Sequence, residues 1–136
     1  MDFDTKIAVV VRDDLATWQK LNVTCFLSGG LAGSSPEIVG KAYADASGNL
    51  YGPLVRQPIL VFAATAADLQ KARRRAIDRA LPISIYTKEL FATGHDDANR
   101  AAVAAVAGDE LDLVGLAIHA DRKSVDKVLK GLSLHR

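Results

Sequence analysis

Four short apolar runs, rich in β-branched residues, constrain the fold of this chain more than any other feature. They are Lys6–Val11, Pro58–Ala64, Pro82–Tyr86 and Leu111–Ala120. Continuous runs of this kind are typical of strands that helices cover on both faces, as in a parallel sheet. The sequence therefore predicts a sheet of about four strands built from these segments.

Helical patterns alternate with the apolar runs. Thr65 and Asp68 have the spacing of a helix N-cap pair, and apolar residues recur at helical spacing after them. Asp121 is placed to cap a last helix, and the alanine-rich segment 96–108 favours another, which Gly108 would end in the left-handed conformation. The alternation predicts an α/β fold with three α/β/α layers and a mixed, mostly parallel sheet.

Length and composition indicate one soluble domain. The 136 residues and 49% apolar content suit a single domain over residues 1–136. A net charge of +1 excludes an obvious polyanion binder. One cysteine, an acidic N-terminus and no apolar stretch near roughly 20 residues favour a cytoplasmic protein away from membranes. The three histidines are too dispersed for a zinc site, so we expect no metal and no cofactor.

The glycine-rich segment Cys25–Glu37 lacks the spacing of a phosphate-binding loop. We expect it to continue a helix whose small residues allow close packing, and a short new helix to begin at Ser35-Pro36-Glu37. Cys25 is expected to be buried in this helix, since free cysteines usually pack as small hydrophobes. Further on, Tyr43–Gly52 carries turn residues between aromatics, which favours a hairpin or ordered loop.

Short motifs along most of the chain resemble the archaeal and eukaryotic type 2 peptidyl-tRNA hydrolase. The matching residues are Val11–Leu15, Leu81–Pro82, Leu116–Ile118, Asp126–Val128 and Leu132–Leu134. The chain is more similar still to a group of uncharacterised bacterial proteins related to that family. The resemblance implies a type 2 peptidyl-tRNA hydrolase-like fold, and it implies hydrolysis of the ester of peptidyl- or aminoacyl-tRNA as the family reaction.

The catalytic groups of that family are missing at the matching positions. Ala16 stands where the family has a lysine, Leu27 where it has a histidine, and Thr87 near the place of its acid. Ester hydrolysis needs an activated water and a stabilised oxyanion, which alanine and leucine cannot supply. The chain is therefore expected to keep the fold and to have lost the reaction.

Polar residues that follow the apolar runs form the candidate site, because ligands of α/β sheets bind beyond the carboxyl ends of strands. The expected ligand-binding residues are Arg12, Asp14, Thr87, Lys88 and His119. The candidates for any remaining catalysis are His119, Lys88 and Glu89. Histidine leads because it exchanges protons near neutral pH. Ordinary helix caps and exposed ion pairs would explain the same residues.

A basic helix face is the one feature that suits tRNA phosphates. Its residues are Lys71, Arg73, Arg74, Arg75 and Arg79. No aromatic residue is interleaved for base stacking, and Asp68 and Asp78 are spaced to pair within the helix, so we favour a solvated face.

Two functions stay open. The first is a non-enzymatic domain that binds a small polar ligand or a protein partner. The second is an esterase of the aminoacyl-tRNA type with a rearranged site. A homodimer is compatible with either function.

Overall fold

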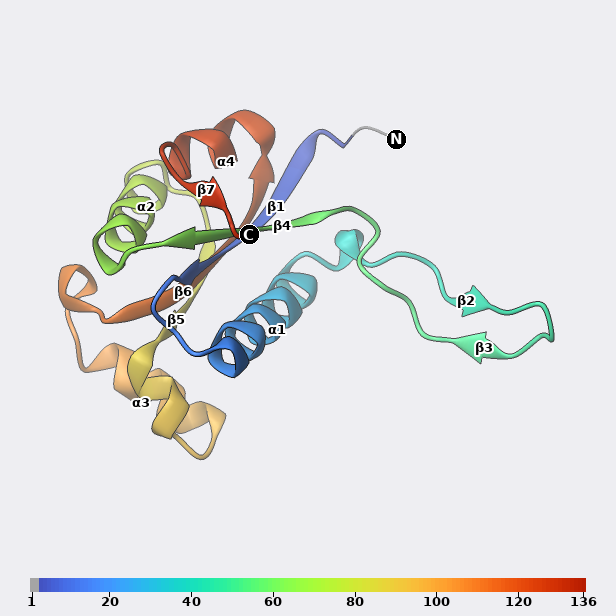
Figure 1. Cartoon of the computed structure of the whole chain (residues 1–136), viewed down its shortest axis with the longest axis horizontal. Coiled ribbons are helices and arrows are strands. Elements are labelled where there is room, and N and C mark those ends of the chain that lie inside the picture. Colours follow the sequence, from blue (N-terminus) through green and yellow to red (C-terminus); the bar gives the residue numbers. More distant parts are fainter. Residues whose placement is uncertain (1–2) are drawn as a thin grey trace.

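A five-stranded mixed sheet forms the centre of the molecule in the computed structural model, which describes residues 3–136 (Figure 1). Its strands lie in the order β5-β6-β1-β4-β7. The strands are β1 Thr5–Arg12, β4 Ile59–Ala64, β5 Ile83–Thr87, β6 Leu113–Asp121 and β7 Ser133–Leu134. The four longer strands coincide with the four apolar runs, so their prediction is confirmed. The two-residue β7 is too short to leave a pattern in the sequence.

The sheet is mixed, as predicted, but the expectation that it is mostly parallel is wrong. Only β1 and β4 pair in parallel within the described residues. Strand β6 runs antiparallel to both β1 and β5, and β7 runs antiparallel to β4. An apolar run indicates that a strand is covered on both faces, but it carries no information on the direction of the strand. The directions of the strands therefore could not be predicted from these runs.

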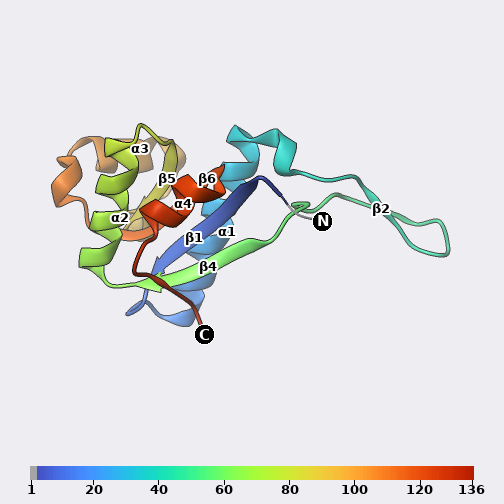
Figure 2. The same cartoon turned by 90° about the horizontal axis from the view of Figure 1, so that it is seen from above.

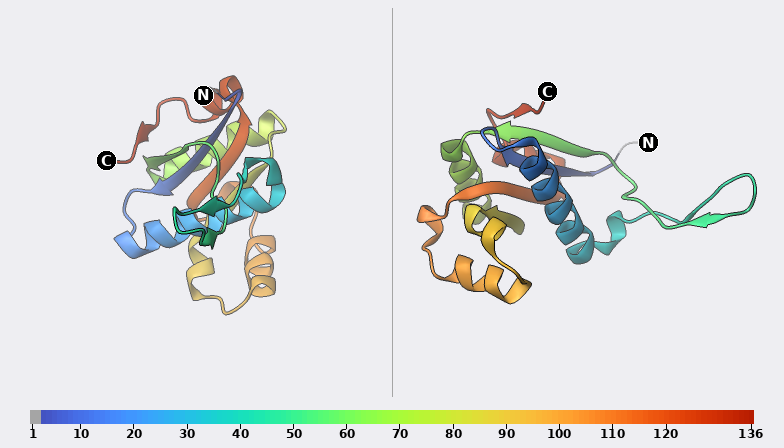
Figure 3. Two further views of the ribbon diagram at one scale, coloured as in Figure 1. Left: turned by 90° about the vertical axis from the view of Figure 1, so that its right-hand side faces the viewer. Right: turned by 60° about the horizontal axis from the view of Figure 1, so that its bottom comes forward.

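Helices cover both faces of the sheet, which makes three layers (Figures 1 and 2). On one face, α1 (Thr17–Ser34) buries Val23, Leu27 and Leu31 against the strands. On the other, α2 (Ala66–Asp78) and α4 (Arg122–Val128) bury a second core. The right-hand view of Figure 3 shows α1 in front of the sheet and α2 behind it. The α/β class is confirmed.

The expected N-caps are present. The hydroxyl of Thr65 accepts a hydrogen bond from the backbone N–H of Asp68 at 3.1 Å, and a carboxylate oxygen of Asp121 accepts one from Ser124 at the same distance. The alanine-rich helix α3 spans Asp96–Ala104. It ends four residues before Gly108, which instead begins the 3-10 turn η3 (Gly108–Glu110) without a positive φ. The predicted left-handed glycine at that helix end is therefore wrong.

The glycine-rich segment continues α1, and a 3-10 turn η1 follows at Pro36–Ile38, as predicted. We expected the small residues of this segment to allow close packing of the helix. This is wrong for Gly29 and Gly33, since a Cβ at either position would meet nothing within 4 Å. The close approach is made by Gly115 of β6, where a Cβ would overlap Val23 and lie 2.9 Å from Leu27. The missing side chain is needed on the strand and not on the helix.

Cys25 lies on α1, as predicted, but it is exposed, so the expectation of burial is wrong. The buried stripe of the helix contains Val23 and Leu27. A residue two positions from each of them points to the opposite side of the helix. Cys25 therefore belongs to the outward surface. Within residues 3–136, no helix is both long and apolar enough to cross a membrane.

A hairpin arm, residues 39–55, projects from the body beyond the C-terminal end of α1 (Figures 1 and 2). Strands β2 (Tyr43–Ala44) and β3 (Leu50–Tyr51) pair antiparallel near its tip, which confirms the predicted hairpin. A bridge between Val39 and Val55 closes its base. Isolated two-stranded hairpins are only marginally stable, so contacts in the turn at the tip must help to stabilise the arm.

The carboxylate of Asp45 makes these contacts. It accepts hydrogen bonds from the Tyr51 hydroxyl at 2.6 Å, from the Asn49 side chain at 3.0 Å and from the backbone N–H groups of Ser47 and Asn49. The Tyr51 bond comes first among the causes that lower the pKa of Asp45 from 3.8 to about 2. Four acceptor bonds on one carboxylate hold both strands of the tip together.

We therefore expect the arm to lose order in acid. A carboxylate with a lowered folded-state pKa stabilises the hairpin fully above pH 3.8, and the contribution is lost as the pH falls through about 2. Amide hydrogen exchange at Asn49 should show protection at pH 5 that disappears near pH 2. The variant Asp45→Ala should lack this protection already at pH 5. Equal protection in both proteins would contradict the assignment.

Candidate functional site

Four of the predicted ligand-binding residues lie at one end of the sheet, where strands β1 and β5 terminate. Arg12 ends β1, Thr87 ends β5, and Asp14 and Lys88 follow these strands. The C-terminal ends of β1 and β5 lie at the same end of the sheet because both strands are antiparallel to β6. Asp112, which precedes β6, joins them through the Lys88 N–H, which donates to the Asp112 carbonyl oxygen at 2.9 Å. We call this group the polar edge.

Ion pairs occupy the polar edge. The Arg12 guanidinium donates to Asp14 and to Asp112, each at 2.7 Å. Burial alone would lower the pKa of Arg12, but the hydrogen bonds and charges of the two carboxylates outweigh it and raise the pKa above its ordinary value. The hydrogen bond from Arg12 also lowers the pKa of Asp14. Since Thr87 is buried, the surface groups left for a ligand are Lys88 and Glu89.

His119 lies at the opposite end of the sheet. It is level with Ile7, whereas Thr87 is level with Leu113, six residues earlier on β6. At about 3.3 Å per residue, roughly 20 Å separate His119 from Lys88 and Glu89. The structure does not bring the three candidate catalytic residues together, because β6 enters the sheet antiparallel.

A polar cluster surrounds His119. Its Nε2 atom lies 3.0 Å from the Thr5 hydroxyl oxygen, and its Nδ1 atom lies 4.0 Å from a Glu37 carboxylate oxygen. The Gln57 amide donates to the same Thr5 oxygen at 3.2 Å. The Thr5 hydroxyl can donate either to the imidazole at 3.0 Å or to the Gln57 amide oxygen at 3.5 Å. The cluster thus places a hydroxyl beside an imidazole, with a carboxylate near the other ring nitrogen but beyond hydrogen-bond distance.

A small cavity of about 270 Å³ adjoins this cluster. It is lined by Leu31, Ser34, Ser35, Pro82, Ile83, Ser84 and His119. The cavity therefore lies between the C-terminal end of α1 and the start of β5. Serine hydroxyls and an imidazole offer hydrogen bonds to a small polar group.

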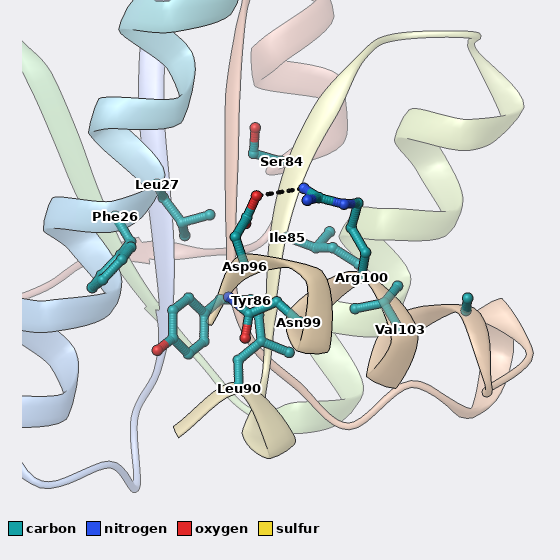
Figure 4. A pocket seen from close by; sticks show the side chains of 11 residues that line it. Phe26, Leu27, Ser84, Ile85, Tyr86, Leu90, Asp96, Asn99, Arg100 and Val103 are labelled. Carbon is teal, nitrogen blue, oxygen red and sulfur yellow. Dashed lines mark hydrogen bonds and ion pairs between the residues drawn. The ribbon is translucent and has the colours of Figure 1, made fainter. Parts of the chain in front are cut away.

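A larger cavity of about 560 Å³ lies between α1, β5 and α3, and sequence reasoning missed it (Figure 4). Apolar and aromatic side chains make up most of its wall: Phe26, Leu27, Ile85, Tyr86, Leu90, Val103 and Ala104. Ser84, Asp96, Asn99 and Arg100 add polar groups. In Figure 4 Asp96 and Arg100 face each other across one side of it, joined at 2.5 Å. We call this space the apolar cavity.

Aromatic contacts fix one wall of the apolar cavity. The rings of Phe26 and Tyr86 meet edge to face with centroids 6.0 Å apart, and Tyr86 contacts Phe91 at 5.1 Å. Trp18 packs on Phe91 at 5.8 Å. Burial raises the pKa of Tyr86, so its hydroxyl stays neutral at physiological pH. The wall is thus built from uncharged rings on α1, β5 and the turn η2 (Lys88–Ala92).

The basic face of α2 is largely engaged within the chain. Arg73 and Arg74 pair with Asp109 of η3, and Arg75 donates to the carbonyl oxygen of Lys130 at 2.9 Å. Lys71 lies 4.0 Å from Asp68, as expected. We expected Asp78 to form an ion pair within the helix. Asp109 of η3 makes the ion pairs instead, and the spacing of residues within one helix could not reveal this.

Comparison with known proteins leaves the activity undefined. A sequence profile of a family described as "Protein of unknown function (DUF2000)" matches residues 5–136. The solved structure of Atu0240 from Agrobacterium tumefaciens strain C58, itself described as a protein of unknown function, is similar with a TM-score of 0.97. The two are 50% identical, over 99% of this chain and 100% of that one. No curated protein matches this chain. None of these findings ties it to peptidyl-tRNA hydrolase.

Proposed function

The chain belongs to the DUF2000 family, whose function is unknown, and we propose that it is a domain that binds a small amphipathic molecule. The observation that supports this proposal is the apolar cavity, whose volume of about 560 Å³ lies within the range of small-molecule sites. Its walls are mostly apolar, and its few polar groups converge from α3 and β5.

The polar groups suggest the chemistry of the ligand. The Asn99 amide oxygen accepts a hydrogen bond from the Thr93 hydroxyl, which directs the amide N–H₂ toward other acceptors. Arg100 pairs with Asp96 and Asp97 at an exposed site, where such pairs exchange partners at little cost. Asn99 and Arg100 donate, whereas the Asp96 carboxylate accepts and is held by Arg100. The expected ligand therefore has an apolar body and one acceptor group, such as a carboxylate, that takes the place of Asp96 on the Arg100 guanidinium.

A matched pair of fluorescent probes tests this proposal. Anilinonaphthalene sulfonate has an apolar body with one anionic group, and phenylnaphthylamine is the same body without the charge. Both should bind the native protein with increased fluorescence. The variant Arg100→Ala should weaken binding of the sulfonate by on the order of tenfold, because a charge-assisted hydrogen bond is lost. It should leave the neutral probe unchanged.

Bulk placed inside the cavity should remove binding of both probes. Ala104 lines the apolar cavity, whereas the neighbouring Ala105, which is also exposed, does not. Ala104→Trp should therefore abolish binding, and Ala105→Trp should preserve it. Circular dichroism and thermal unfolding would check that both variants fold. Equal binding by the two variants would place the probes elsewhere and defeat the proposal.

Ester hydrolysis is the second candidate function, and the His119–Thr5 contact beside a small cavity favours it. In this reaction His119 would take a proton from a water that attacks the ester carbonyl. It would return the proton to the departing alcohol oxygen, which yields an acid and an alcohol. The polar edge takes no part in this scheme, since it lies at the far end of the sheet.

A type 2 peptidyl-tRNA hydrolase-like fold remains part of the proposal. The resembling motifs support it by their positions: Val11–Leu15 covers the end of β1, Leu81–Pro82 precedes β5, and Leu116–Ile118 lies within β6. A tRNA partner is the weaker alternative, because the basic face of α2 is engaged by Asp109 and by backbone oxygens. Cytoplasmic location stays a prediction from the sequence.

A further inference from the structure

The outward side of α1 is apolar where a surface helix normally carries charges. No charged residue occurs between Leu21 and Pro36. The inward side of the helix packs on the sheet. On the outward side Leu21 is 63% exposed and Phe26 is 62% exposed, and Trp18 and Cys25 are exposed as well. We call Trp18, Leu21, Cys25 and Phe26 the outer face of α1.

The arm is the second exposed apolar surface. Leu50 is 81% exposed, and Tyr43, Tyr51 and Leu54 are more than half exposed. Lys41 and Asp45 are the charged residues of the arm, and the carboxylate of Asp45 is already bound within the tip. The hairpin projects from the body in Figures 1 and 2 and in the right-hand view of Figure 3, and its apolar side chains are exposed.

We propose that two copies of the chain form a twofold dimer in which the arm of each lies along the outer face of α1 of the other. The lengths agree. The 18 residues of α1 span about 27 Å at 1.5 Å per residue. Each strand of the arm spans about 25–30 Å from base to tip. The arm leaves the C-terminal end of α1 (Figure 3, right), so a twofold axis brings each arm back along the partner helix.

The area is sufficient for a specific contact. An arm about 25 Å long and about 10 Å wide covers roughly 250 Å² of its neighbour. Twofold symmetry makes the contact twice, and with both surfaces counted about 1,000 Å² becomes buried. This is near the lower limit for a specific protein interface. The dimer should therefore dissociate on dilution.

A second copy fits these surfaces better than a different protein does. Both halves of the contact lie on one chain, so a single rotation satisfies the arm and the helix together. Neither surface carries the cluster of charge that would select an acidic or basic partner. Phe26 belongs to both the outer face of α1 and the wall of the apolar cavity, but Leu21 and the arm do not line that cavity. Variants at Leu21 and Leu50 therefore test the dimer without changing the proposed ligand site.

Sedimentation velocity over a range of concentrations tests the dimer. The wild-type chain should change from monomer to dimer as concentration rises. Leu21→Glu and Leu50→Glu should each raise the dissociation constant by on the order of a hundredfold, because each buries a charge in an apolar contact. Ile77→Glu is the control, since Ile77 is an exposed apolar residue on α2, across the sheet. A wild-type monomer at high concentration would overturn the proposal.

A cross-link identifies the surfaces in contact. Cys25 is the only cysteine and lies on the outer face of α1. Mild oxidation of Leu50→Cys should give a covalent dimer between Cys25 of one copy and the new thiol of the other. Adding Cys25→Ser should abolish the product, and wild type should form little of it. A covalent dimer that persists without Cys25 would show a different symmetric contact and overturn the proposed one.

Discussion

Substitution of Gly115 by alanine lowers the free energy of unfolding by about 1–3 kcal/mol. The new Cβ would overlap Val23 and lie 2.9 Å from the Leu27 side chain, both buried on α1. The carbonyl oxygen of Val10 lies on another side at 3.5 Å. The side chains cannot move away freely in a close-packed core, so α1 must shift from the sheet. Equilibrium urea denaturation measures the change.

Gly30 provides the matched control for this experiment. A Cβ at Gly30 would lie 3.7 Å from the Ser84 hydroxyl, which is an ordinary contact. Gly30→Ala should therefore raise stability by up to about 1 kcal/mol, since alanine favours a helix interior over glycine. If Gly115→Ala were as stable as the wild-type chain, the distance between α1 and the sheet would be set by other residues.

Hydrolysis of peptidyl-tRNA should proceed at the background rate. Ala16 and Leu27 stand at the positions of two catalytic groups of the hydrolase that the chain resembles, and Thr87 near the third is buried. Removing one stabilising donor commonly costs on the order of a hundredfold or more in rate, and three groups are missing. Release of a blocked amino acid from tRNA by the purified chain is the measurement.

Variants distinguish the possible results of this assay. Turnover that is lost in His119→Ala alone would contradict the expected inactivity and support the second candidate function. Turnover that survives Lys88→Ala, Glu89→Gln and His119→Ala would contradict both the inactivity and the candidate site. Binding of the naphthalene probes in the apolar cavity is a separate readout and is unaffected by either result.

The elements of the fold could be predicted from the sequence because burial and capping act locally. The strands β1, β4, β5 and β6 are continuous apolar runs, and Thr65 and Asp121 cap the helices that follow. Strand direction could not be predicted, since it depends on which strands become neighbours. The exposure of Cys25 was missed for a related reason: α1 is apolar on its outward side as well, so periodicity could not identify the buried stripe.

The candidate site depends on long-range contacts, and less of it could be predicted. Arg12 and Lys88 meet at one edge because β1 and β5 are parallel to each other, although they are not neighbours. Mostly parallel strands would put His119 at the same edge, but β6 is antiparallel to β1 and places His119 at the other end of the sheet. The apolar cavity joins residues of α1, β5 and α3 whose sequence patterns indicate only core packing.

The place of β6 in the sheet has a consequence for synthesis of the chain. This strand lies between β5 and β1, yet it is the last long strand to leave the ribosome. Until Leu113–Asp121 has emerged, β1 and β5 have no partner on the sides where β6 will insert, and their hydrogen-bonding groups are available to other chains. The part of the chain before residue 113 therefore cannot complete the sheet by itself during translation. A release of nascent chains before residue 113 should give aggregation-prone fragments that need a chaperone.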